Sequence, residues 1–314
     1  MAMDLPLARS IDAMSGSGSP VRRCRNGKTL RTMDTPKFAT DEQKSVRIGP
    51  VPNEAWRKVD EGWGRRAVEF ATLSEPANCR EYVGMHHRLR VSQDDRLLDV
   101  ACGSGLAIEL ATLRGASCAG IDASDRLVAI ARDRNSEVEI VVGDMNQLPW
   151  DDATFTVVTS FRGIWGTTPA AVGEIHRVLV PGGRLGLTVW GHIKASSGAW
   201  ALAPFKMAAP QKVENQAAMV ALGRPGVGEQ LLAEHGFVDI ERIEIPFVWE
   251  FADPDVYART LASTGPAYEA IQHVGEEAFY REATEIARSQ IREGLPLRAS
   301  IKVVGFVGVK PDGR

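Results

Sequence analysis

Short apolar runs alternate with amphipathic stretches between residues 96 and 190, and this alternation limits the possible folds more than any other feature. Five runs have the length and composition of strands, at residues 96–101, 117–122, 138–144, 155–161 and 183–190. The intervening stretches 106–113, 124–131 and 169–179 carry apolar residues at helical spacing. Strands that alternate with helices predict a parallel sheet with helices on both faces.

The C-terminal third departs from this alternation. Residues 239–247 and 300–309 alternate apolar and polar side chains, as half-buried strands do, and we expect them to pair antiparallel. The spans 191–226 and 252–298 interrupt the pattern after strands, which predicts helical inserts that cover a substrate site. The predicted fold is therefore α/β: a Rossmann-like, doubly wound sheet of about seven strands, mostly parallel, with an antiparallel terminal hairpin.

The chain before residue 91 divides into two segments. Residues 1–45 are rich in Gly, Ser and Arg and poor in apolar side chains, which predicts a flexible N-terminal arm that could support a homodimer. Residues 46–90 repeat apolar side chains at three- and four-residue steps and form a predicted helical segment, which Pro76 divides into two helices. Residues 91–314 are then expected to form the main domain.

Charge and cysteine pattern narrow the class of protein. The 314 residues carry a formal net charge of −3, which does not favour a nucleic-acid or membrane surface. The four cysteines show no CxxC spacing, so no metal site or disulfide framework is predicted, and scattered thiols suit a reducing cytoplasm. No apolar run reaches the ~18 residues of a membrane span. We expect a cytoplasmic protein that acts on a small molecule.

The stretch RLLDVACGSGLA, residues 96–107, is a strand that ends in a glycine turn before a helix. Gly103 and Gly105 let a ligand approach the backbone closely, at the strand end where open parallel sheets bind ligands. Ile108 stands where a dinucleotide fingerprint needs Gly or Ala, and no Gly-Lys-Ser/Thr of a phosphate loop is present. Asp99 would repel a pyrophosphate and attract an ammonium group, so the turn favours a nucleoside with a cationic amino-acid tail.

Acidic residues also end the next two strands. Asp122 can accept hydrogen bonds from both hydroxyls of a ribose, as happens in NAD sites too. Asp144 could accept from an adenine amino group, with Met145 packing on the ring or offering its backbone N–H. Three acidic strand ends in sequence order indicate a nucleoside site more strongly than any one of them.

Four stretches in this order and spacing resemble a known family. LLDVACGSG, GIDAS, GDMNQLPWDDATFTVV and RVLVPGGRL are similar to the successive motifs of class I S-adenosylmethionine-dependent methyltransferases. The resemblance extends over roughly residues 56–314 and is strongest to the branch that acts on small molecules, including quinones and natural products. Ala101 stands where many members have glycine, which we interpret as a minor departure.

The resemblance implies a role for each matching residue. It places Asp99, Ala101, Gly103 and Gly105 around the methionine part of the cofactor, Asp122 on the ribose, Ala123 beside the adenine, and Asp144 and Met145 at the adenine edge. Phe161, after the fourth strand, would lie near the sulfonium. Trp63, or else Trp56, would close over the cofactor.

The resemblance implies transfer of a methyl group from S-adenosyl-L-methionine to a small-molecule acceptor by in-line displacement, with S-adenosyl-L-homocysteine as product. The acceptor atom stays open, because a hydroxyl acceptor needs a base more often than a thiol, an amine or a stabilised carbanion. One alternative is an NAD(P)-dependent oxidoreductase, which Asp122 fits and which Asp99 and Ile108 disfavour. The other is a non-catalytic cofactor-binding protein on the same fold.

Two further features have alternative interpretations. His192 follows the fifth strand, where it is either a general base at the rim of the site or an ordinary loop residue. The aromatic side chains between residues 247 and 257 either line an apolar substrate pocket or fill the core.

Overall fold

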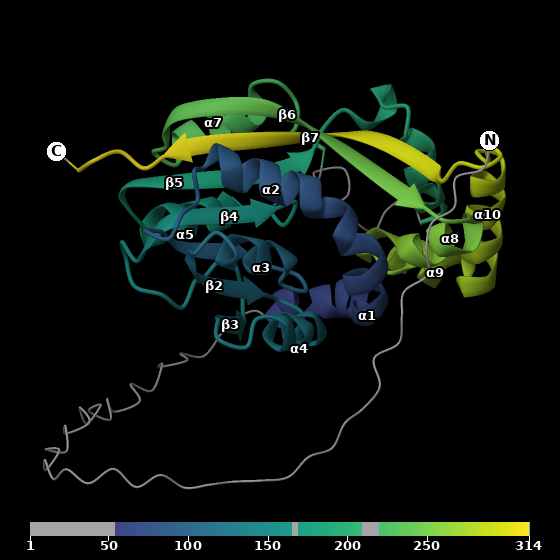
Figure 1. Ribbon diagram of the computed structural model, residues 1–314, viewed down its shortest axis with the longest axis horizontal. Helices are drawn as coiled ribbons and strands as arrows, with labels where there is room; N and C mark the ends of the chain where they lie inside the picture. The colour runs from purple at the N-terminus through teal and green to yellow at the C-terminus, as the bar shows by residue number, and fades with distance from the viewer. Residues whose placement is uncertain (1–53, 165–168, 209–219, 314) are drawn as a thin grey trace, which may run out of the picture. The chain divides into compact units, whose positions relative to one another are not determined.

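The computed structural model describes residues 54–164, 169–208 and 220–313, so the predicted arm at residues 1–45 lies outside the described residues. A seven-stranded sheet with the order β3-β2-β1-β4-β5-β7-β6 forms the centre of this part of the chain (Figure 1). The strands are β1 (Arg96–Val100), β2 (Ser117–Asp122), β3 (Glu139–Val142), β4 (Phe155–Phe161), β5 (Leu179–Trp190), β6 (Val238–Phe251) and β7 (Leu297–Val309).

Strands β1 to β5 pair in parallel, which confirms the expected sheet. Strand β7 runs antiparallel to both β5 and β6 and lies between them, so the terminal pair is antiparallel as predicted. These two strands are not joined by a tight turn: three helices, α8 (Pro254–Ala262), α9 (Gly265–Val274) and α10 (Glu276–Arg288), lie between them in the sequence.

Alternate residues of the central strands face two different cores. Leu97 packs into one core with Met85 of helix α2 (Cys79–Arg88). Its neighbour Leu98 packs into another core with Val172 of helix α5 (Pro169–Val178). Helices α3 (Leu106–Thr112) and α4 (Asp125–Arg134) follow β1 and β2, and α7 (Val227–Glu234) precedes β6. Helices thus cover both faces of the sheet, because the central strands are apolar on both sides.

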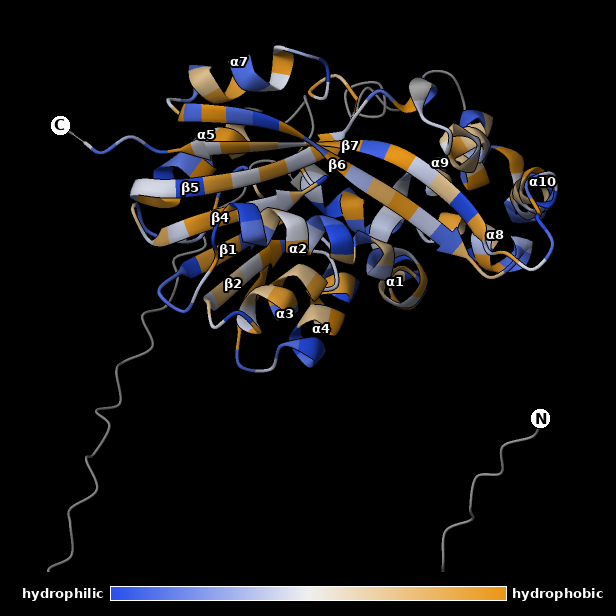
Figure 2. Ribbon diagram, turned by 45° about the horizontal axis from the view of Figure 1, so that its top comes forward, coloured by the Kyte–Doolittle hydropathy of each residue, from blue (hydrophilic) through white to orange (hydrophobic). Residues whose placement is uncertain are grey.

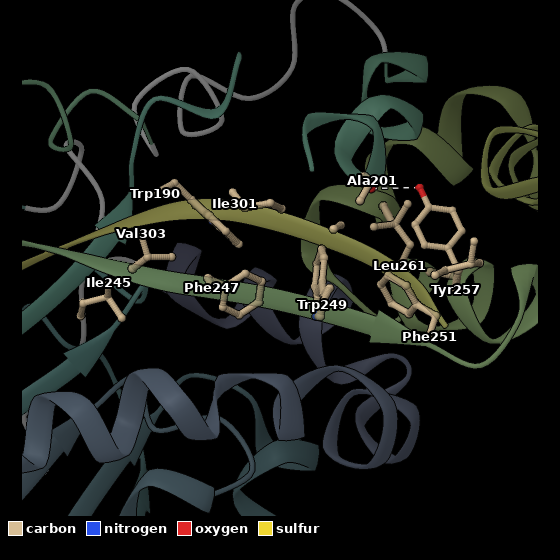
Figure 3. Close-up of a cluster of buried hydrophobic side chains, with 14 of the residues drawn as sticks. Trp190, Ala201, Ile245, Phe247, Trp249, Phe251, Tyr257, Leu261, Ile301 and Val303 are labelled. Carbon is tan, nitrogen blue, oxygen red and sulfur yellow. Dashed lines mark hydrogen bonds between the residues drawn. The ribbon is translucent and has the colours of Figure 1, made fainter. Parts of the chain in front are cut away.

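The long strands extend past the residues that the pattern predicted. Strand β6 continues to Phe251, and in β7 buried and exposed residues alternate from Leu297 to Lys302. Figure 2 shows hydrophobic and hydrophilic residues alternating along this part of the ribbon. Of the additional residues of β6, Trp249 and Phe251 belong to an aromatic cluster that also includes Trp190 and Tyr257 (Figure 3). The Tyr257 hydroxyl donates to the backbone carbonyl of Ala201 at 2.9 Å, which ties α8 to the first insert.

The N-terminal helical segment differs from the two regular helices expected. Short helical pieces of several types precede α2: η1 (Glu54–Lys58), η2 (Asp60–Gly64), α1 (Ala67–Glu69), η3 (Phe70–Ser74) and η4 (Glu75–Asn78). Pro76 lies in η4, and a regular α-helix begins only at Cys79. Proline lacks an N–H and its ring clashes with the preceding turn, so the i to i−4 ladder cannot continue through it.

Both inserts contain helical elements in their described residues. The first contains η5 (Ile193–Ala195) and η6 (Ala199–Met207), and the second contains α8, α9 and α10. Within the described ranges, no helix combines the length and the apolar character needed to span a bilayer.

Candidate cofactor and acceptor site

A cavity of about 950 Å³ lies at the carboxyl ends of β1, β4 and β5. Its wall includes Asp99, Ala101 and Gly103 from the turn after β1 and Phe161 at the end of β4. Strands β1 and β4 are neighbours in the sheet, but the chain continues outward from them in opposite directions. Open α/β sheets bind ligands at such a switch point, because the loops diverge there and leave a crevice.

The turn after β1 has three residues in the left-handed region. Ala101, Gly103 and Gly105 have φ angles of +59°, +56° and +80°. Glycine adopts this conformation freely, whereas alanine pays roughly 1–2 kcal/mol for the contact between its Cβ and the carbonyl oxygen. Ala101 stands where many members of the similar family have glycine, and the sequence analysis interpreted this as a minor departure. Its left-handed φ instead places backbone strain in the wall of the cavity.

Asp99 is a buried carboxyl group in the cavity wall, with a side chain 2% exposed. The Thr159 hydroxyl donates to its Oδ1 at 2.7 Å. Burial raises the pKa of Asp99 to about 8, and the nearby Glu75 and Asp122 also raise it, while the Thr159 hydrogen bond lowers it. A cation bound beside this group would favour its ionised form.

Asp122 lies next to the turn but uses its carboxylate within the protein. The backbone N–H groups of Gly103 and Ser124 donate to its two oxygens at 2.8 and 2.9 Å. Burial raises the pKa of Asp122, and these hydrogen bonds lower it. The carboxylate therefore connects the end of β2 to the glycine turn after β1.

The residues expected around the adenosine do not all reach the cavity. Its wall contains Trp63 and His192, in addition to the four residues already named, but not Gly105, Asp122, Ala123, Asp144 or Met145. Asp144 accepts from the backbone N–H of Asn146 at 2.9 Å, and Met145 packs against the core on the α5 side of the sheet.

The N-terminal segment lies on the loop beside Ala123. The Ser124 hydroxyl donates to Asp60 in η2. Gly64, at the end of η2, permits this contact, because a Cβ there would stand 2.4 Å from the Ser124 hydroxyl oxygen. This loop therefore lies under η2 rather than in the cavity wall.

Glu75 forms a connection that the sequence analysis missed. Its side chain is 1% exposed and lines the cavity. Arg134 of α4 donates to its Oε2 at 2.8 Å, and the Ser104 hydroxyl donates to the same oxygen. Burial raises the pKa of Glu75 against the lowering effect of these two partners. No local pattern marks this residue, because its partners are 29 and 59 positions away in the sequence.

The wall at the end of β4 is aromatic and contains a buried ion pair. Phe161 packs on Tyr82 with ring centroids 4.5 Å apart. The next residue, Arg162, pairs with the buried Glu81 at 3.0 Å and stacks on Trp190 at 4.7 Å from the ring centroid. The structure thus places Phe161 in the cavity wall. The sequence did not indicate that its neighbour Arg162 lies there too.

Trp63 and His192 complete the wall from opposite directions. Trp63 contacts Phe70 edge-on, with ring centroids 5.7 Å apart. The indole of Trp63 also packs against the start of α9 at Gly265, where a Cβ atom would stand 2.3 Å from the Trp63 Nε1. Of the two candidate tryptophans, Trp63 lines the cavity and Trp56 does not. His192 is exposed at the rim, two residues after β5.

Known proteins match a part of the chain that contributes to this site. Residues 98–187 match the family model described as a methyltransferase domain. The demethylmenaquinone methyltransferase of Chlorobaculum tepidum is 38% identical over 99 residues, which are 31% of this chain and 41% of the relative. The 27-O-demethylrifamycin SV methyltransferase of Amycolatopsis mediterranei is 32% identical over 160 residues, 44% of this chain and 58% of the relative. The chain spans about half the length of these curated relatives.

Solved structures agree on the fold. The phosphoethanolamine N-methyltransferase 2 of Haemonchus contortus, in complex with S-adenosyl-L-methionine, has a TM-score of 0.52 at 17% identity, covering 82% of this chain and 60% of that chain. The YcgJ protein of Bacillus subtilis has a TM-score of 0.50 at 18% identity, covering 74% of this chain and 98% of that chain. Residues 98–187 therefore match a methyltransferase domain, and the described chain shares the Rossmann-like fold of the two solved structures.

Proposed function

We propose that this protein transfers a methyl group from S-adenosyl-L-methionine to a small-molecule acceptor and releases S-adenosyl-L-homocysteine. The observation that carries the proposal is Asp99, a buried carboxyl group in the wall of a large cavity at the switch point of the sheet. In its ionised form, which a bound cation favours, a buried acid beside a glycine turn attracts an ammonium group and repels the pyrophosphate of a dinucleotide. The match of residues 98–187 to a methyltransferase domain supports the same cofactor.

The residues present fit the methionine end of this cofactor. Asp99 would hold the amino group, and the backbone of Gly103 would approach the tail, since both line the cavity. We propose that Asp122, Ala123, Asp144 and Met145 hold the adenosine, with Gly105 in the turn beneath it. The family resemblance supports this assignment, although these residues lie outside the cavity wall.

The bound cofactor supplies a methyl group that its sulfonium already activates, so the chain mainly aligns the acceptor and excludes water. Trp63 and Phe70 cover the cavity on the N-terminal side, and Phe161 lines it at the end of β4. His192 at the rim is our candidate base for a hydroxyl acceptor; a thiol or amine acceptor would not require it.

Calorimetric titration with S-adenosyl-L-homocysteine tests the proposal directly. We expect saturable binding to the wild-type protein and a loss of at least about tenfold in affinity for Asp99→Asn, because a charged hydrogen bond contributes about 1.5–3 kcal/mol. Asp94→Asn, an exposed carboxylate five positions away, is the matched control and should bind normally. Binding of NADH in place of the homocysteine derivative would refute the proposal and favour the oxidoreductase.

Turnover separates an enzyme from a cofactor-binding protein. Incubation with methyl-labelled S-adenosyl-L-methionine and a small-molecule extract should transfer label to an acceptor, whereas a cofactor-binding regulator would retain it. We also propose a cytoplasmic location, which the free thiols of Cys79, Cys102 and Cys118 support.

A further inference from the structure

The cavity continues beyond the part that fits the methionine tail. Past the end of β5 its wall is formed by η5, η6, residues 220–225 and the strands β6 and β7. Figure 3 shows Trp190 of β5 and Trp249 of β6 in this region. On the proposed function, this part of the cavity, past the end of β5, would hold the methyl acceptor.

Positive charge gathers on this part of the wall. It contains Lys194, Lys206, Arg224, Arg242 and Lys302, with Glu244 as the acidic residue among them. Glu244 pairs with Lys302 at 3.1 Å, and Arg242 pairs with Glu229 at 3.6 Å.

Three of these cations are outside the ion pairs formed among the described residues. Across residues 54–164, 169–208 and 220–313, Lys194, Lys206 and Arg224 form no ion pair, and all three are exposed. The chain as a whole has a net charge of −3, so this local excess runs against its overall balance. A cavity lined by one sign of charge concentrates ligands of the opposite sign.

The same cavity has an apolar wall with one unused donor. Trp190 and Trp249 are 8% and 4% exposed, and Leu202, Phe205 and Val220 line the cavity beside them. The indole N–H of Trp249 is buried and has no hydrogen-bond partner in the described part of the chain. A buried donor without a partner costs stability, so an oxygen of a ligand or water that reached this N–H would bind favourably.

We propose that the methyl acceptor is an apolar, ring-sized molecule that carries an anionic oxygen group, either a carboxylate or a phosphate. Its apolar part packs against Trp190 and Trp249, where the indole N–H can donate to an oxygen. Its anionic group faces Lys194, Lys206 and Arg224. A neutral molecule of the same shape gains only the apolar contacts and binds more weakly.

Three naphthalene probes test this proposal by calorimetry, with the protein saturated with S-adenosyl-L-homocysteine at low salt. We expect 2-naphthoate to bind about tenfold more tightly than the neutral 2-naphthamide. Each exposed cation of the wall attracts the carboxylate modestly, and the three together account for this difference in affinity. Raising the salt concentration should remove most of this preference. 2-Naphthyl phosphate is the third probe: whichever anion binds more tightly identifies the group, and either order supports the proposal.

The triple variant Lys194→Ala, Lys206→Ala, Arg224→Ala should lose the preference for the anion, with its affinity for 2-naphthamide unchanged. Arg288→Ala removes an exposed cation in the last turn of α10, outside the cavity wall, and should keep the preference. If the triple variant does not fold, the salt dependence of 2-naphthoate binding to the wild-type protein still decides the question.

The cofactor titration distinguishes the two possible failures. A protein that does not bind S-adenosyl-L-homocysteine contradicts the proposed function. A protein that binds it but binds neither naphthalene anion, or binds the anions and 2-naphthamide equally, overturns only the inference about the acceptor. Retention of the full preference by the triple variant would also overturn it.

Discussion

The methyl group of Ala101 lies where a side chain at Gly163 would be: a Cβ atom on Gly163 would stand 2.3 Å from the Ala101 Cβ. Ala101 is in the turn after β1 and Gly163 follows β4, so the two strand ends that border the cavity meet at this point. The alanine adopts a left-handed conformation that glycine adopts more easily, and the glycine opposite makes room for its methyl group.

This contact predicts coupled stabilities. Gly163→Ala should lower the free energy of unfolding by about 1–3 kcal/mol, as overpacking does. Ala101→Gly alone should change it by less than about 1 kcal/mol, because relief of the left-handed strain offsets the greater chain entropy of glycine. The double variant should be more stable than Gly163→Ala, which urea denaturation of all four proteins would show. Strictly additive effects would mean that the two positions do not compete for space.

Gly105 is a second position in the turn where a side chain cannot fit. Its φ is +80°, and a Cβ would stand 2.9 Å from the Cβ of Ala131 in α4. Gly105→Ala should therefore destabilise the protein by about 1–3 kcal/mol. The control is Gly84→Ala in α2, where a Cβ would meet nothing within 4 Å.

That control should stabilise the protein by about 0.5–1 kcal/mol, since alanine loses less conformational freedom in a helix than glycine. Thermal unfolding followed by circular dichroism would separate the two variants. If they shift the midpoint equally, the turn at Gly105 is not as closely packed as the structure shows.

Asp99 makes stability depend on pH. Burial raises the pKa of Asp99 to about 8, so the folded protein keeps a proton that the unfolded chain loses above pH ~4. This contribution to stability is complete at low pH and is lost progressively up to pH ~8, by at most about 1.4 kcal/mol per pH unit. Asp99→Asn should therefore gain stability over the wild type as pH rises from 4 to 8. A difference independent of pH would contradict the raised pKa.

The same group makes cofactor binding depend on pH. A cationic amino group pairs best with ionised Asp99, so the affinity for S-adenosyl-L-homocysteine should rise between pH 6 and pH ~8, with release of a proton. Calorimetry in buffers with different ionisation enthalpies measures that proton. The Asp99→Asn variant should show neither effect.

Arg134 has two carboxylate partners, Glu75 and Glu109, and we expect substitutions at the two to differ in their effect on stability. Glu75 is buried and lies 2.8 Å from the guanidinium, whereas Glu109 is 43% exposed and lies at 3.6 Å. Glu75→Gln should lower the free energy of unfolding by about 1–3 kcal/mol, because it leaves a buried polar network with one charge uncompensated. Glu109→Gln should cost less than about 0.5 kcal/mol. Equal costs, measured by denaturation, would show that the buried pair adds nothing beyond the exposed one.

Local pattern was enough to predict the parallel core of the sheet. The runs at β1, β2 and β4 were predicted to within a residue or two, because a strand buried on both faces is a continuous apolar run and its turns contain glycine. Helical spacing also placed α3, α4 and α5. The segment before Cys79 was predicted as a helix that Pro76 interrupts, since apolar spacing does not distinguish an α-helix from short 3₁₀ and π pieces.

Long-range contacts decided the rest. The position of β7 between β5 and β6 depends on long-range pairing, which for β5 and β7 joins residues more than a hundred positions apart and which no local pattern encodes. The ion pair of Glu81 with Arg162, and the hydrogen bond that the Gly103 N–H donates to Asp122, likewise join residues that are not neighbours along the chain.

The sequence by itself determined the fold class, the glycine turn and the acidic strand ends, because each depends on residues that are close along the chain. The tertiary structure decided which of those residues reach the cavity. Asp99 and Phe161 do, since β1 and β4 are neighbours at the switch point, whereas Asp122 turns its carboxylate to the backbone of the adjacent turn. It also brought Lys194, Lys206 and Arg224 together on one wall, from segments that are separate in the sequence.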